Sequence, residues 1–106
     1  MKYTIGTNHF NTQKEMDNHY REIIAKYDWG ETLSPEDHID AIELLQFHPD
    51  KEEKIGVGLD HIEIRRNTRE SHGFNTKCFF IIRVDGSDID FSKKCIQYVP
   101  KNKIKL

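Results

Sequence analysis

The spacing of apolar residues changes near residue 55, and this change restricts the chain to folds that combine helices with an antiparallel sheet. Before it, apolar side chains recur at steps of mostly three and four, as on one face of a helix: Met16, Tyr20, Ile23, Ile24 and Tyr27. After it, Ile62 and Ile64 alternate with polar residues, as in a strand with one buried face. Helical and strand segments in separate blocks are typical of α+β domains.

Two helices are predicted from the signals at their ends. A Thr-x-x-Glu capping box predicts that the first helix begins at Thr12, and Asp28-Trp29-Gly30 should end it. Ser34-Pro35 repeats the start signal, with serine as the cap and proline at the first helical position. Pro49 should end the second helix at about residue 48, because the residue before proline is disfavoured in the α region.

The strands are predicted from alternation and turn chemistry. A short strand from Lys2 to Ile5 precedes the helices, and the strand through Ile62 and Ile64 follows them. Cys78 to Ile82 is apolar at both parities, which predicts a central strand. Asp85-Gly86 predicts a two-residue type I′ turn that returns the chain through Ile89 and Phe91.

Ser92 to Val99 is predicted to form a turn and then an edge strand, which Pro100 ends. The predicted fold class is therefore α+β. Two amphipathic helices should pack on one face of a small, mainly antiparallel sheet, in the order β-α-α-β-β-β.

The length of 106 residues suits one domain, predicted over residues 1–100, with a basic tail at 101–106. No run approaches the roughly 20 apolar residues of a membrane span, and Met1 leads directly into structured sequence, so we expect a cytoplasmic protein. Cys78 and Cys95 form no CxxC pair, which favours reduced, buried thiols. We expect no metal and no cofactor.

Charge is distributed unevenly along the chain. Through Glu53 there are twelve acids and five bases, a net charge of −7, whereas from Lys54 onward eleven bases and six acids give +5. After Asp90 there is no acid at all, while lysines accumulate. The C-terminal end is therefore a candidate surface for a polyanion, with a solvated tail as the plainer alternative.

Short motifs that suggest catalysis have plainer explanations. His61 with Asn67 and His72 resembles an HNH nuclease, but the gaps are short and residues 67–73 read as a polar loop. His48-Pro49-Asp50 spells the tripeptide of J-domain co-chaperones, but the preceding helix is acidic where theirs is basic. We therefore expect a protein that is not an enzyme.

Four sequence blocks stand in a fixed order: Leu44 to Pro49, Lys54 to Gly58, Cys78 to Arg83, and Asp85 to Cys95. Together they resemble the "defective chloroplasts and leaves" (DCL) family, and the resemblance extends from about Ile5 to Ile96. The residues that carry it are His48, Pro49, Lys54, Gly56, Gly58, Arg83, Asp85, Gly86, Asp90, Phe91, Ser92 and Cys95.

The resemblance implies a link to RNA and no catalytic residue. It implies that plant members are plastid proteins needed for ribosomal RNA maturation, and that related domains end the largest subunits of plant-specific RNA polymerases. This chain differs from plant members in lacking a transit peptide and in having Lys93 where an aromatic residue often follows Ser92. Both differences fit a prokaryotic or phage origin.

Four polar motif residues, His48, Lys54, Arg83 and Asp90, should converge where the second helix meets the sheet. An ion pair between Arg83 and Asp90 across the hairpin would be structural, and a basic patch would be functional; both remain open. The main hypothesis is a module that binds RNA or DNA backbone with low sequence specificity. Its candidate contacts are His48, Lys54, Arg65, Arg66, Arg83, Lys93, Lys94, Lys101, Lys103 and Lys105.

Two alternatives belong to other classes. A protein-interaction module could dock on a polymerase, nuclease or ribosomal protein through the acidic helix face from Glu36 to Glu43. The third hypothesis is a metal-dependent nuclease that uses His61, Asn67 and His72. The sequence leaves the oligomeric state open.

Overall fold

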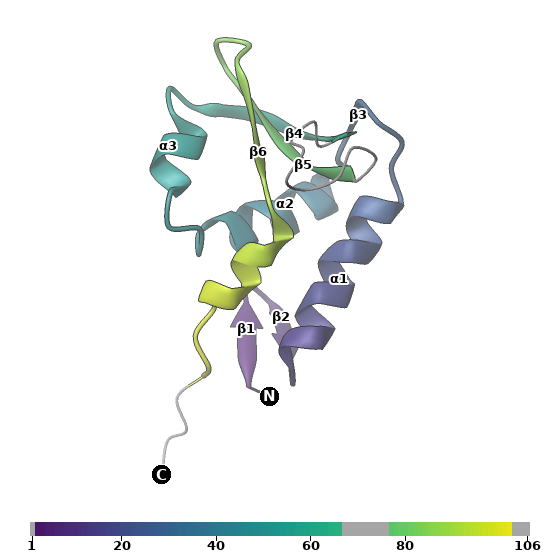
Figure 1. Ribbon diagram of the computed structural model, residues 1–106, viewed down its shortest axis with the longest axis vertical. Helices are drawn as coiled ribbons and strands as arrows, with labels where there is room; N and C mark the ends of the chain where they lie inside the picture. The colour runs from purple at the N-terminus through teal and green to yellow at the C-terminus, as the bar shows by residue number, and fades with distance from the viewer. Residues whose placement is uncertain (1, 67–76, 103–106) are drawn as a thin grey trace.

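The computed structural model describes residues 2–66 and 77–102, which form two antiparallel sheets and four helices (Figure 1). The larger sheet has the strand order β3-β4-β5-β6, with bounds Glu31–Thr32, Leu59–Arg66, Lys77–Arg83 and Asp88–Phe91. A separate hairpin pairs β1 with β2, with bounds Tyr3–Ile5 and Asn8–Phe10.

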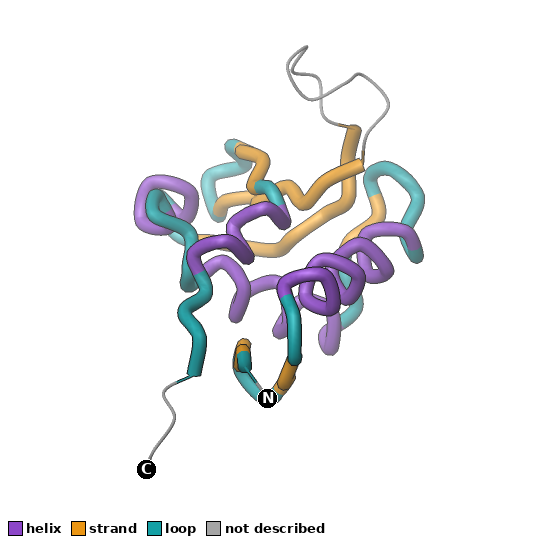
Figure 2. Tube along the Cα trace, turned by 60° about the horizontal axis from the view of Figure 1, so that its bottom comes forward, coloured by secondary structure: helices purple, strands orange, loops and turns teal. Residues whose placement is uncertain are grey.

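The main helices, α1 (Gln13–Ala25) and α2 (Pro35–Leu45), lie on one side of the larger sheet, as Figure 2 shows. A short helix, α3 (Lys51–Ile55), precedes β4, and a 3₁₀ helix, η2 (Lys93–Tyr98), follows β6. The predicted α+β class and the helices on one face of an antiparallel sheet are confirmed.

Both predicted helix starts are confirmed by their caps. The Thr12 hydroxyl accepts from Glu15 N at 3.1 Å, and the Glu15 side chain accepts from Thr12 N, which completes the capping box. The Ser34 hydroxyl accepts from Asp37 N at 3.3 Å. The second helix ends at Leu45, earlier than predicted, because the chain tightens there into turns before Pro49.

The core lies between the sheet and the helices. Across β4 and β5, Ile62 pairs with Ile81 and Ile64 with Phe79, and all four side chains are fully buried. Phe79 stacks on Phe91 of β6, with ring centroids 5.0 Å apart. The period-two alternation therefore places its apolar residues against the helices, as the sequence predicts.

The edge strand predicted within Ser92 to Val99 is wrong, because this segment forms η2. The Ser92 hydroxyl accepts from Lys94 N at 3.1 Å and so starts a helical turn. Cys95 and Ile96 are consecutive and both buried, where η2 packs against α1 and α2. A strand would turn one of these two side chains to solvent.

The two-residue type I′ turn at Asp85-Gly86 is also wrong. Such a turn needs a positive φ at both positions, and only Gly86 has one, at 88°. Arg83 N donates to Ser87 O at 2.8 Å and Gly86 N to Arg83 O at 2.9 Å, which makes a three-residue loop. Asp85 Oδ1 accepts from Ser87 N at 3.0 Å, so the aspartate stabilises this longer loop.

Three elements were missed because their signals are weak. β2 and β3 have only three and two residues, too few to show a period. The third element is α3, whose five residues bury no side chain completely and so give no apolar stripe to read. Its C-terminal end is held by hydrogen bonds with the β5–β6 hairpin.

Candidate nucleic-acid interface

The polar motif residues do lie together, between α3 and the β5–β6 hairpin. The Arg83 guanidinium donates from Nε to Lys54 O and from Nη2 to Glu53 O, each at 3.0 Å. Lys54 Nζ donates to Asp90 O at 2.7 Å. The carbonyls of Glu53 and Lys54 lie at the end of a short helix, and the carbonyl of Asp90 faces outward from an edge strand. Arg83 and Lys54 therefore donate the hydrogen bonds that these backbone acceptors need.

The motif glycines allow this close approach. Gly56 has φ 56° and ψ −123°, and a Cβ at this position would lie 2.8 Å from Arg83 Nε. Gly58 has φ 133°, and its carbonyl accepts from Val84 N at 2.9 Å. A larger side chain at Gly56 would displace the Arg83 guanidinium, whereas a Cβ at Gly58 would meet Val84 at an ordinary contact distance of 3.5 Å, so at Gly58 the positive φ is what favours glycine. We call this set of contacts the α3 clamp: Lys54, Gly56, Gly58, Arg83 and Asp90.

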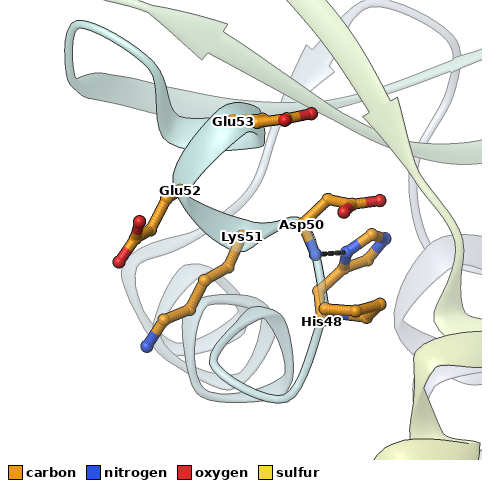
Figure 3. A pocket seen from close by; sticks show the side chains of 6 residues that line it. His48, Asp50, Lys51, Glu52 and Glu53 are labelled. Carbon is orange, nitrogen blue, oxygen red and sulfur yellow. Dashed lines mark hydrogen bonds between the residues drawn. The ribbon is translucent and has the colours of Figure 1, made fainter.

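His48 lies beside the α3 clamp at an open hollow of about 400 Å³ that residues 48–53 line. Figure 3 shows its ring turned toward Asp50, whose backbone N donates to His48 Nδ1 at 3.0 Å. Burial lowers the pKa of His48, and the charge of Lys54 lowers it further. Both effects favour the neutral ring, so in the free protein they oppose a charged contact between His48 and a phosphate.

The other motif residues are also explained by folding. Ser92 caps η2, and the Cys95 thiol donates to Leu44 O at 3.8 Å. Burial raises the pKa of Cys95 to about 12, so this thiol does not ionise at physiological pH. These motif residues therefore belong mainly to the framework of the fold.

Arg65 lies on the face of the sheet opposite the helices, where acids neutralise it. Its Nη1 lies 2.6 Å from Asp88 Oδ2, and its Nε donates to Glu63 Oε2 at 2.8 Å. His61 lies between two carboxylates, with Nδ1 2.6 Å from Asp60 Oδ2 and Nε2 2.9 Å from Glu63 Oε1. This sheet face is acidic and would repel a polyanion.

The lysines after Asp90 fall into two groups. Lys93 is paired with Asp17 on α1. Lys94 and Lys101 are exposed, and within the described part of the chain no carboxylate pairs with either. Lys103 and Lys105 lie outside the described residues.

The C-terminal segment is attached to the body of the protein. Asn102 N donates to Lys2 O at 2.7 Å, and Asn102 Nδ2 to Thr4 Oγ1 at 2.8 Å. Figure 1 shows this segment descending from η2 beside β1. The contact brings the exposed Lys2 next to Lys101. The sequence does not reveal this proximity, because the two residues lie at opposite ends of the chain. We call the three exposed lysines of the chain ends, Lys2, Lys94 and Lys101, the C-terminal basic strip, a name that groups them by exposure and charge.

Arg66 is exposed at the end of β4, and its guanidinium lies 4.2 Å from the centre of the Trp29 ring. Arg66 was expected from the sequence as a contact residue, but Trp29 was not. The sequence did contain a signal for Trp29, since the single tryptophan stands in a predicted turn. Turns are exposed, so burial in the core does not explain a large aromatic side chain there.

The acidic helix face predicted as a protein contact is turned largely inward. Asp37 is only 7% exposed and accepts from Tyr27 Oη at 2.6 Å and from Lys26 Nζ at 3.0 Å. Burial raises the pKa of Asp37, but hydrogen bonds from Tyr27 and Lys26 outweigh it and hold the pKa below its usual value. Asp37 therefore fastens α2 to α1.

The next two acids of α2 are also engaged with the body. Asp40 accepts from Asn8 Nδ2 at 3.1 Å, and its other oxygen lies 3.1 Å from His19 Nε2. The carboxylate of Glu43 packs on Gly6, and its Oε2 is buried with no hydrogen-bond partner in the described structure. Of the acids from Glu36 to Glu43, Glu36 alone is exposed, while the others are buried or half-buried.

The candidate nuclease site does not assemble within the described residues, because Asn67 and His72 lie outside them. Across residues 2–66 and 77–102, no three His, Cys, Asp or Glu side chains gather as metal ligands would. Among the described helices, none has the length and apolar character needed to cross a membrane.

These features define a small α+β module in which motif residues build the framework and exposed lysines lie elsewhere. By comparison with known proteins, the chain belongs to the family described as "Protein of unknown function (DUF3223)", whose model matches residues 21–96.

Relatives and a solved structure agree with this assignment. The chain is 41% identical over 84 residues to "Protein DCL homolog, chloroplastic" of Arabidopsis thaliana, covering 77% of this chain and 37% of that protein. It is 39% identical over 69 residues to "DNA-directed RNA polymerase V subunit 1" of the same plant, covering 64% of this chain and 3% of that subunit. The resemblance to the DCL family is confirmed.

The solution NMR structure of an uncharacterized protein from Rhodospirillum rubrum has the same fold. Its TM-score is 0.77 at 32% identity, covering 87% of this chain and 85% of that one. The chain spans about a third of the chloroplast relatives it matches, so their whole activities do not transfer to it directly.

Proposed function

We propose that this chain is a non-enzymatic cytoplasmic module that binds the RNA or DNA backbone with low sequence specificity, through the C-terminal basic strip. The observation that supports this proposal is the exposure of Lys2, Lys94 and Lys101 beside a segment that contains no acid. Lysine contacts with phosphates hold a strand in place without reading its bases.

The proposal uses fewer residues than the sequence suggested. Lys54 and Arg83 are engaged in the α3 clamp, and Lys93 and Arg65 are neutralised by carboxylates. Cations with such partners gain less from a phosphate, because binding must first break an existing contact. Two relatives are named as DNA-directed RNA polymerase subunits, which agrees with a role near nucleic acid.

The test is the fluorescence anisotropy of labelled single-stranded RNA and DNA, measured against salt. The logarithm of the binding constant should fall linearly with the logarithm of salt concentration. Replacing Lys94 and Lys101 by glutamine should reduce that slope by about 1.4, since each single-strand phosphate contact contributes roughly 0.7. The matched control is Lys93→Gln, which removes the same charge from the neighbouring position and should leave the slope unchanged.

Two results would remove the proposal. One is a flat salt dependence, or no binding at micromolar protein in low salt. The other is an equal loss of affinity in Lys93→Gln and in Lys94→Gln, which would show that binding depends on the total charge and not on the C-terminal basic strip.

A second candidate, docking on a polymerase, nuclease or ribosomal protein, is favoured by an exposed apolar pair. Val57 is 67% exposed and Val84 is 61% exposed, and the Val84 N to Gly58 O hydrogen bond holds their loops together. A partner that remains bound after nuclease treatment, and that the Val57→Ser, Val84→Ser double variant releases, would favour docking over nucleic-acid binding.

A further inference from the structure

Trp29 lies in the turn between α1 and β3, two elements that Figure 1 labels, and its ring stacks with the guanidinium of Arg66 from the end of β4. Trp29 is the one tryptophan of the chain and is 44% exposed. The guanidinium of Arg66 lies over its ring, with Cζ 4.2 Å from the ring centroid. Since Arg66 is itself exposed, the stack has a planar cationic group open to solvent.

The turn that carries Trp29 is held in place by its neighbours. Gly30 N donates to Ile64 O at 2.6 Å, which attaches the turn to β4. Lys77 Nζ donates to Tyr27 O at 2.9 Å and attaches it to β5. These contacts fix the backbone on both sides of Trp29, so a ligand that stacks there would meet a preformed surface.

The charges around the stack nearly balance. Arg66 and Lys77 are cross-strand neighbours in the register of β4 and β5. The exposed acids of the turn are Asp28 and Glu31, and the Glu31 carboxylate accepts from Asp28 N at 2.6 Å. The stack therefore offers a flat aromatic and cationic surface rather than strong charge.

Flat aromatic rings and guanidinium planes are the groups on which proteins stack unpaired bases. We propose that Trp29 and Arg66 form a stacking platform for an unpaired base of a single-stranded nucleic acid. This inference rests on the proposed function and adds a preference for single strands, because duplex bases are already stacked and out of reach. The lysine strip alone would not discriminate between the two forms.

The first test uses the unmodified protein, because Trp29 is the only source of tryptophan fluorescence. A short oligouridylate should quench this fluorescence, and a duplex of matched length should not. The second test is anisotropy with Trp29→Ala, whose affinity for the single strand should fall by about 5- to 150-fold, the effect of removing one stacked base. Affinity for the duplex should stay the same.

Two variants serve as controls. Trp29→Phe keeps a ring and should retain part of the affinity, whereas Arg66→Met removes the guanidinium plane and should lower it. Urea unfolding of each variant, followed by circular dichroism, checks that the fold is kept. A loss of single-strand affinity in a fully folded Trp29→Ala protein supports the platform.

The possible failures can be told apart. If neither single strand nor duplex binds, the proposed function is wrong and the platform with it. If both bind with no quenching and Trp29→Ala binds as tightly as the original protein, the platform is wrong and the proposed function stands.

Discussion

Replacing Gly56 by alanine tests whether Arg83 fastens α3 to the hairpin. The φ of 56° and ψ of −123° at Gly56 are unfavourable for a residue with a Cβ and cost about 1–3 kcal/mol. The new Cβ would lie 2.8 Å from Arg83 Nε, so the guanidinium would have to leave the carbonyls of Glu53 and Lys54. Losing these partly exposed hydrogen bonds costs roughly a further 1–2 kcal/mol.

Gly56→Ala should therefore lower the free energy of unfolding by about 2–5 kcal/mol. The matched control is Gly86→Ala, since Gly86 also has a positive φ, 88°, but a Cβ added there would meet no atom within 4 Å. Gly86→Ala should therefore lower the free energy of unfolding only by the cost of backbone strain. The assay is urea unfolding, followed by circular dichroism and by Trp29 fluorescence.

A double-mutant cycle isolates the contribution of Arg83. In an Arg83→Met background the guanidinium is already absent, so Gly56→Ala should cost about 1–2 kcal/mol less than in the original protein. Equal costs in the two backgrounds would refute the reasoning, because the glycine and the arginine would then act independently.

Three further predictions concern stability. Asp37→Asn should lower the free energy of unfolding by about 1–2 kcal/mol near pH 7. Because the pKa of Asp37 is lowered in the folded protein, the stability that its carboxylate contributes is present above the usual pKa of 3.8 and is lost as pH falls through the folded value. Acid unfolding of the original protein and of the variant measures this loss. Phe91→Ala should cost about 3–5 kcal/mol in urea unfolding, since the ring is fully buried. The His61 ring donates hydrogen bonds to the carboxylates of Glu63 and Asp60, and these bonds raise the pKa of His61. Its NMR titration should therefore have a midpoint above 6.5, and the stabilisation that the charged ring supplies should be lost as pH rises through that midpoint. A midpoint at or below 6.5 would contradict the double carboxylate contact.

Elements with local signals could be predicted from the sequence. The caps at Thr12 and Ser34 and the alternation in β4 depend on residues close together in the chain, and the structure shows them as expected. The helix η2 could not be predicted in this way. Its residues fit either a strand or a helix, and packing against α1 and α2 decides between them.

The candidate site was predicted less well, because charge in a sequence does not show its partners. Lys93 and Lys94 are adjacent, yet one is paired with Asp17, 76 residues away, and the other is exposed. Lys54 and Arg83 look like phosphate contacts in the sequence, but folding uses them to complete backbone hydrogen bonds. Only the tertiary structure separates framework cations from exposed ones.

The most direct test of nucleic-acid binding through the C-terminal basic strip is an NMR titration of ¹⁵N-labelled protein with single-stranded RNA. We expect the amide signals of Lys94, Lys101 and Lys2, and the indole signal of Trp29, to shift, while those of the α3 clamp stay in place. Shifts centred on residues 54–58 and 83–86 would contradict this expectation, because the motif residues would then be the contact surface and not the framework.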